Sequence, residues 1–199
     1  MTTWILLRAA GIGSYVMLFL AVAWGLVATT SLVTKRTSKQ SANLFHAFVA
    51  TTGLALLGVH MALLFVDEFV PFSMAGLFVP MSSGYRPLAI TAGIVSMYGI
   101  VTIVVTSWLR KKLGTAWWRR VHLLAVPMFS LSLAHGVFAG TDTERPWMFT
   151  LYAVTGLLVV FLTLVRAFTY GYRPPRPAPE ERPEEKKARP VAELQPDAA

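Results

Sequence analysis

Residues 43–66 read NLFHAFVATTGLALLGVHMALLFV, an apolar run with a histidine near each end and no charged side chain. The run is longer than the ~20 residues that a helix needs to cross the hydrocarbon core of a bilayer. Four further apolar runs without Asp or Glu occupy residues 9–33, 87–109, 117–140 and 147–170. Because lipid offers the backbone no hydrogen bonds, each run is expected to be a helix. The sequence therefore predicts an all-α, polytopic membrane helix bundle of about five transmembrane helices.

The overall composition agrees with a membrane protein. The chain is 55% hydrophobic and 14% charged, whereas soluble proteins carry about 25% charged residues. It has no cysteine, which excludes disulfides, Cys-ligated zinc and iron–sulfur clusters. The net charge of +8 arises before residue 173, because residues 173–199 hold six basic and six acidic side chains. Basic clusters between apolar runs indicate membrane topology rather than nucleic-acid binding.

The loops between the runs differ in charge. The connections between the first and second runs and between the third and fourth hold, together with Arg119 and Arg120 at the start of the fourth run, eight Lys and Arg and no acid. The opposite loops contain four acids, Asp67, Glu68, Asp142 and Glu144. The positive-inside rule therefore predicts an N-terminus outside and a C-terminus in the cytoplasm, and we expect the membrane to be that of a bacterial cell. The first run lacks a signal-peptide cleavage site and is interpreted as a retained helix.

Composition divides the chain at residue 172. Residues 1–172 hold all five runs and are predicted to form one transmembrane domain. Its outer connection, residues 67–86, contains prolines and glycines that break a regular helix, and we expect it to lie as a cap in the outer interface. Residues 173–199 are rich in Pro, Glu, Lys and Arg and are predicted to be a disordered cytoplasmic tail.

The four histidines of the chain all lie in two of the runs. His46 and His60 occupy the second run, and His122 and His135 the fourth. Both runs cross from inside to outside, so His46 and His122 share an inner level and His60 and His135 an outer one. At ~1.5 Å per residue, spacings of 14 and 13 residues place the two levels roughly 20 Å apart. That separation suits two stacked cofactors and is too long for one metal cluster.

The helical phase of the histidines differs between the two runs. Fourteen residues return nearly to the same face, so His46 and His60 point together, with Gly53 midway on that face. We expect the missing side chain of Gly53 to leave room between two cofactors. Thirteen residues leave His135 off the face of His122 in an ideal helix. Pro127 lies between them and is predicted to kink or re-phase the helix.

Two imidazoles at each level favour one kind of cofactor. Zinc and copper sites need three or four ligands that converge on one point, whereas a haem needs only two axial ligands. Bis-imidazole ligation fills both axial positions and favours electron transfer over oxygen binding. In the alternative interpretation, the histidines are hydrogen-bonded within a haem-free scaffold or relay protons in a transporter.

The histidine-bearing segments resemble a known family. They are HAFVATTGLALLGVH at 46–60, WWRRVHLLAVPMFSLSLAH at 117–135, HGVFAGTD at 135–142 and SGYRPLAI at 83–90. Over roughly residues 8–170 the chain resembles the ferric reductase-like transmembrane domain of ferric reductases, NADPH oxidases and bacterial methionine sulfoxide reductase haem subunits. The resemblance implies transmembrane electron transfer through two haem b groups. It also implies that His46 and His122 ligate the inner haem iron and His60 and His135 the outer one.

The resemblance also bears on the electron donor. Flavocytochrome members of the family continue into FAD- and NADPH-binding domains, whereas residues 173–199 contain no dinucleotide fingerprint. We therefore expect an oxidoreductase component that takes electrons from a separate flavoprotein, a loosely bound flavin or membrane quinol. A complete quinol-dependent reductase acting on an external acceptor such as ferric iron is the second interpretation.

Arginines near the ends of the runs are candidates for binding the carboxylates of haem. Arg119 and Arg120 lie at the inner interface, and Arg86 and Arg8 at the outer one. Positive charges also anchor spans at the cytoplasmic interface, and for Arg119 and Arg120 this interpretation stands beside the first.

Overall fold

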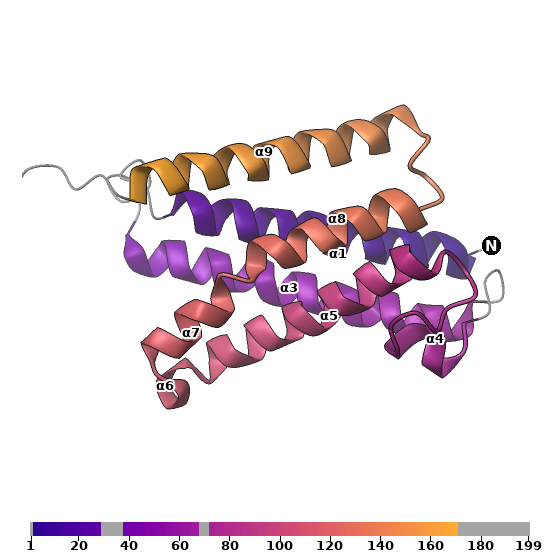
Figure 1. Cartoon of the computed structure of the whole chain (residues 1–199), viewed down its shortest axis with the longest axis horizontal. Coiled ribbons are helices and arrows are strands. Elements are labelled where there is room, and N and C mark those ends of the chain that lie inside the picture. Colours follow the sequence, from indigo (N-terminus) through magenta and orange to yellow (C-terminus); the bar gives the residue numbers. More distant parts are fainter. Residues whose placement is uncertain (1, 29–37, 68–71, 171–199) are drawn as a thin grey trace, which may run out of the picture. The chain divides into compact units, whose positions relative to one another are not determined.

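The computed structural model describes residues 2–28, 38–67 and 72–170 and places most of them in helices (Figure 1). The helices are α1 (Thr2–Val27), α3 (Lys39–Val66), α4 (Met74–Phe78), α5 (Pro87–Trp108), α6 (Arg110–Leu113), α7 (Thr115–His122), α8 (Ala125–Ala139) and α9 (Pro146–Tyr170). No β-strand occurs in these three segments. Five stretches are long and apolar enough to span a membrane: Thr2–Val27, Lys39–Val66, Pro87–Trp108, Thr115–Ala139 and Pro146–Thr169. The predicted all-α membrane bundle is confirmed.

Some of the expectations fall on parts of the chain that the structure does not describe. The predicted tail at 173–199 lies outside the described residues, as do Lys35, Arg36 and Glu68 of the charge argument. The basic residues of the connection between α5 and α7, Arg110, Lys111 and Lys112, lie within the short helix α6. Residues 1–166 form one compact unit, which contains all four histidines.

Two antiparallel helix pairs build this unit: α1 lies along α3, and α5 along α8. Small side chains let the paired backbones approach each other, as is usual where lipid supplies no hydrophobic drive between helices. Ser14 Oγ of α1 donates a hydrogen bond to the Gly53 carbonyl of α3 at 3.1 Å. Ser96 Oγ of α5 donates to the Met128 carbonyl of α8 at 2.9 Å. Each bond ties a side chain of one helix to the backbone of its neighbour.

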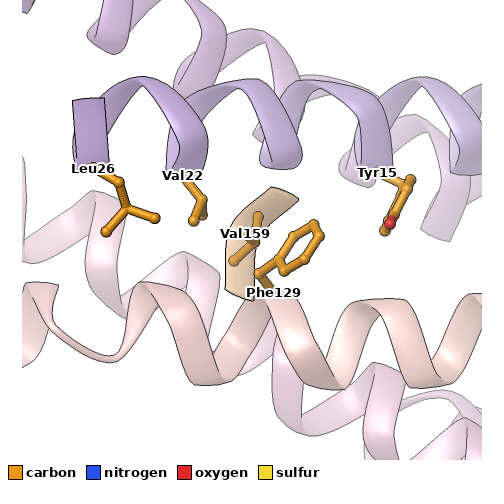
Figure 2. Packing of buried hydrophobic residues seen from close by; sticks show 5 residues of the cluster. All are labelled: Tyr15, Val22, Leu26, Phe129 and Val159. Carbon is orange, nitrogen blue, oxygen red and sulfur yellow. The ribbon is translucent and has the colours of Figure 1, made fainter. Parts of the chain in front are cut away.

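The apolar core joins α1, α8 and α9 (Figure 2). Phe129 of α8 is only 1% exposed and stacks on Tyr15 of α1, with the ring centres 5.7 Å apart. Val159 of α9 completes the contact. The Tyr15 hydroxyl shares a 2.5 Å hydrogen bond with Thr155 of α9, so the one polar atom that Tyr15 brings into the core is satisfied.

The outward face of α9 is apolar. Leu157 is 71% exposed, Val160 57% and Phe161 59%. An apolar surface of this size is covered by lipid in a membrane helix, so the protein is an integral membrane protein in contact with lipid.

The fourth span is interrupted between α7 and α8. The break falls at Leu123 and Leu124, where the Leu124 N–H bonds the carbonyl three residues back, at Val121. Pro127 explains the position of the break, because its ring has no N–H and clashes with the carbonyl four residues earlier, that of Leu123. The sequence predicts that Pro127 kinks or re-phases the helix between His122 and His135, and the structure shows that the helix is interrupted at Leu123 and Leu124.

The described part of the connection between α3 and α5, residues 72–86, packs back onto the bundle. It contains α4, whose Leu77 is 3% exposed. The Phe78 carbonyl accepts a 2.9 Å hydrogen bond from the Tyr98 hydroxyl of α5, and the Met81 N–H donates to Thr91 Oγ1. These contacts hold the connection against α5.

Candidate functional site

A cavity of about 270 Å³ lies between α1, α3, α5 and α8, and both His60 and His135 line it. Leu77 and Tyr85 of the outer connection contribute to its wall. The two histidines that were predicted to share the outer level therefore share one cavity. We name His60 and His135 the outer pair.

Both rings of the outer pair are fixed in the same way. His60 Nδ1 lies 3.1 Å from the Leu7 carbonyl of α1, and His135 Nδ1 lies 2.9 Å from the Ala89 carbonyl of α5. A carbonyl can only accept a hydrogen bond, so Nδ1 carries the proton and donates in each case. In the neutral imidazole the other ring nitrogen, Nε2, is then unprotonated and has a lone pair for a metal.

A glycine stands four residues after each accepting carbonyl. A methyl group on Gly11 would lie 2.9 Å from His60 Nδ1, and one on Gly93 would lie 2.6 Å from His135 Nδ1. Real side chains do not approach this closely. Each imidazole therefore lies against a part of the neighbouring helix that only glycine leaves open.

His46 and His122, here named the inner pair, also lie together. Their ring centres are 5.9 Å apart and their planes are inclined by 62°. The His46 ring lies against Gly25 of α1, where a methyl group would be 3.4 Å from Cε1. The Trp118 ring lies 5.0 Å from the His122 ring, and its Nε1 donates to Ser107 Oγ of α5. The inner pair is thus held from both sides by packing.

The inner and outer pairs differ in how their nitrogens are bonded. Nδ1 of His46 and of His122 is buried and has no hydrogen-bond partner within the described residues. The Ala21 carbonyl, four residues before Gly25, faces the His46 ring without reaching the geometry of a normal hydrogen bond. A buried nitrogen without a hydrogen-bond partner is costly, so the inner pair is a candidate site for a further group.

The spacing of the inner pair fits two axial ligands of one metal. With metal–imidazole nitrogen distances of about 2 Å, two rings on opposite sides of an ion have centres roughly 6 Å apart. The observed 5.9 Å agrees with that value. No group of three or more His, Asp or Glu side chains suited to a metal ion occurs in the described part of the chain. Pairs of imidazoles are thus what these residues offer, and this is the donor set that a bis-histidine haem requires.

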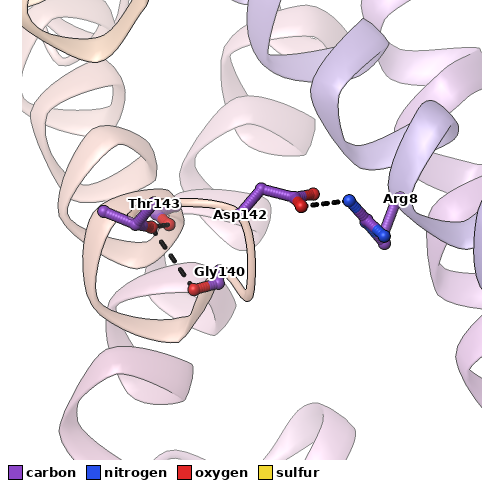
Figure 3. A network of polar contacts seen from close by, with 5 residues as sticks. Arg8, Gly140, Asp142 and Thr143 are labelled. Atoms are coloured by element: carbon purple, nitrogen blue, oxygen red, sulfur yellow. Dashed lines mark hydrogen bonds and ion pairs between the residues drawn. The ribbon is translucent and has the colours of Figure 1, made fainter. Parts of the chain in front are cut away.

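Of the four candidate arginines, Arg8 alone lines the cavity. It forms an ion pair with Asp142 of the α8–α9 loop, in which Thr143 Oγ1 donates to the Gly140 carbonyl at 3.3 Å (Figure 3). Arg86 is not on the cavity wall, and its Nη1 donates to the Phe138 carbonyl. Arg119 and Arg120 lie exposed on α7.

One sequence interpretation was wrong, and three residues were missed. Gly53 was expected to leave room between two cofactors. In the structure it faces α1 instead, where a methyl group would lie 3.1 Å from Met17 Cβ. The missed residues are Gly11, Gly25 and Gly93. The sequence contains a signal for two of them. Gly11 and Gly25 are 14 residues apart, which is also the spacing of His46 and His60 on the helix that they contact.

Comparison with known proteins adds one match. The family model described as "Ferric reductase like transmembrane component" matches residues 10–133, more than half of the chain. The match includes His46, His60 and His122 and ends two residues before His135. No curated protein and no solved structure matches the chain. The resemblance seen in the sequence is confirmed: the chain belongs to the family of ferric reductase-like transmembrane components, a family of membrane redox components.

Proposed function

We propose that this protein carries electrons across the membrane through two b-type haems, as the membrane cytochrome b subunit of a reductase. The observation that carries the proposal is the presence of two separate histidine pairs, each drawn from α3 and from the interrupted fourth span. His46 and His122 would ligate the inner haem iron, and His60 and His135 the outer. Residues 1–172 would form the haem domain.

Haem b supplies reversible one-electron chemistry when bound. The residues of the chain contribute orientation and exclusion of competing ligands. One imidazole from α3 and one from the fourth span would hold each haem iron and would exclude water and oxygen as competing ligands. The carbonyls of Leu7 and Ala89 hold the outer rings with Nε2 free. Arg8, on the wall of the outer cavity, is the arginine best placed for an outer carboxylate, and Arg119, on α7 near His122, is the candidate at the inner level.

The donor in this proposal is a separate flavoprotein or membrane quinol, and the acceptor lies at the outer side. The two donors are distinguished by adding each of them to the purified protein and following haem reduction. Haem reduction by quinol alone would identify a quinol-dependent enzyme. Reduction that requires a flavoprotein would identify a subunit of a larger reductase.

The haem content of the purified protein tests the proposal. A reduced-minus-oxidised difference spectrum should show a b-type cytochrome, and a pyridine haemochrome assay should give two haems per chain. A spectrum without haem would contradict the proposal and favour the haem-free scaffold or transporter. One haem per chain would contradict the two-site arrangement.

The proposed orientation places the basic α6–α7 connection inside and the α8–α9 loop outside. Because the chain has no cysteine, single cysteines at exposed positions report topology without background. In intact cells a membrane-impermeant maleimide should label Glu144→Cys and leave Lys111→Cys unlabelled. Both variants should react after permeabilisation. The reverse pattern in intact cells would invert the orientation and with it the names inner and outer.

A further inference from the structure

Contacts between α1 and α3 repeat every seven residues. Glycine alternates with a larger residue on both helices, so that each glycine faces a side chain or backbone of the partner. The contacts are, in order, Gly11 with His60, Gly53 with Met17 Cβ and the Leu18 backbone, and Gly25 with His46. Seven residues return nearly to the same helix face, so a single seam carries both histidines of α3. The histidines are therefore part of the packing between the two helices.

The same arrangement occurs between α5 and α8. His135 lies on Gly93 and its Nδ1 bonds the Ala89 carbonyl, as His60 lies on Gly11 and bonds the Leu7 carbonyl. In both cases the accepting carbonyl is four residues before the glycine. Two different helix pairs thus share one local geometry. The glycine has no Cβ, so the imidazole can reach a backbone carbonyl that also accepts a hydrogen bond within its own helix.

We propose that Gly11 and Gly93 are positioning residues of the outer pair. They let the Leu7 and Ala89 carbonyls take the Nδ1 protons, which fixes the ring planes and leaves Nε2 of both histidines for the outer haem. A hydrogen bond at Nδ1 also makes the imidazole a stronger donor to the metal. Among the described residues, hydrogen bonds of normal geometry from Nδ1 to a carbonyl are found at the outer pair, so the inference concerns the outer site. The proposal rests on the proposed haem-binding function.

A series of Gly→Ala substitutions tests the positioning role of Gly11 and Gly93, because each substitution adds the same methyl group at a different position. The methyl group would lie 2.6 Å from a ring nitrogen at Gly93 and 2.9 Å at Gly11. At Gly25 it would lie 3.4 Å from the ring of His46, an ordinary contact. At Gly58 of α3 it would meet nothing within 4 Å. The severity of the effect should therefore fall in the order Gly93, Gly11, Gly25, Gly58.

The first readout is the rate at which the purified protein transfers haem to excess apomyoglobin. For Gly93→Ala and Gly11→Ala, one of the two haems should leave roughly 10- to 100-fold faster than in the wild type, as is typical when a group supporting a metal ligand is lost. The other haem should leave at the wild-type rate. Gly58→Ala, whose methyl group would meet nothing within 4 Å, should resemble the wild type in both phases.

The second readout is the midpoint potential of each haem. Loss of the Nδ1 hydrogen bonds makes the imidazole a weaker donor, so the potential of the outer haem should rise in Gly11→Ala and Gly93→Ala. Gly53→Ala serves as the packing control, because its methyl group would strain the α1–α3 seam at Met17 without touching a histidine. Its outer potential should remain that of the wild type.

The outcomes separate this inference from the proposed function. If the wild type binds two haems, and Gly11→Ala and Gly93→Ala behave like Gly58→Ala in both readouts, the glycines do not position the ligands. If Gly53→Ala shifts the outer potential as Gly11→Ala does, the effect is general loosening, and the inference is wrong. If the wild type binds no haem, the proposed function itself fails.

Discussion

In sealed vesicles, the variant His60→Ala/His135→Ala should accept electrons from the side of the basic α6–α7 connection and pass none to an acceptor on the other side. The inner pair keeps both of its imidazoles in this variant, so the inner site remains reducible. The outer cavity loses both of the imidazoles that are proposed to bind the outer haem, so the proposed route would end inside the membrane. The rate of electron transfer to a ferric chelate on the outer side should fall to the background rate. This rate is measured by the absorbance of the ferrous product.

The variant His46→Ala/His122→Ala is the matched control for that experiment. It should be reduced by an impermeant reductant added on the outer side and should not be reduced from the side of the basic connection. The experiment uses vesicles that hold the protein in either orientation, with the reductant added on one side only. Comparing the two orientations shows from which side haem reduction is blocked. If the two double variants respond alike from both sides, electrons do not pass through the levels in series, even if haem is present.

Phe129→Ala is expected to cause the largest loss of stability among single apolar substitutions. Its side chain is 1% exposed and lies against Tyr15 and Phe19 of α1, with ring centres 5.7 and 6.2 Å away. Truncation leaves a cavity between α1, α8 and α9. Large-to-small changes of this kind cost about 3 kcal/mol or more in soluble cores, and lost packing is the main term in a membrane.

Thermal unfolding in detergent, followed by tryptophan fluorescence, measures this effect. Phe161→Ala is the control, because it removes the same atoms from a side chain of α9 that is 59% exposed. The melting temperature of Phe129→Ala should fall by several degrees, and that of Phe161→Ala should stay close to the wild type. Equal shifts in the two variants would show that the cluster around Phe129 does not hold the bundle together.

The helices could be predicted because lipid imposes a simple length and polarity rule. The ends of the helices depend on contacts that the rule does not include. The first helix was expected from residue 9 and begins at Thr2, although Arg8 then lies within it. Asp142, far along the chain, pairs with Arg8 and so makes a charge tolerable in that position. A prediction from local sequence has no access to that partner.

For the candidate site, the histidine pairs could be predicted from the sequence, and the glycines that contact them could not. Four histidines in two runs indicated which imidazoles lie at the same depth, and the structure brings His46 to His122 and His60 into one cavity with His135. The glycines could not be assigned, because their role depends on which helix lies opposite and in which register. Gly53 illustrates the difference: it shares the face of His46 and His60, as expected, but that face packs against α1.

The most direct test of the central claim is the haem content of histidine double variants, measured by the pyridine haemochrome assay. Removing both members of one pair, as in His46→Ala/His122→Ala or His60→Ala/His135→Ala, should leave one haem per chain. Removing one member of each pair, as in His46→Ala/His60→Ala, should leave none firmly bound, because each site then has a single imidazole. The account predicts this contrast between two variants with the same number of substitutions. Equal haem content in all of these variants would contradict the assignment of one haem to each histidine pair.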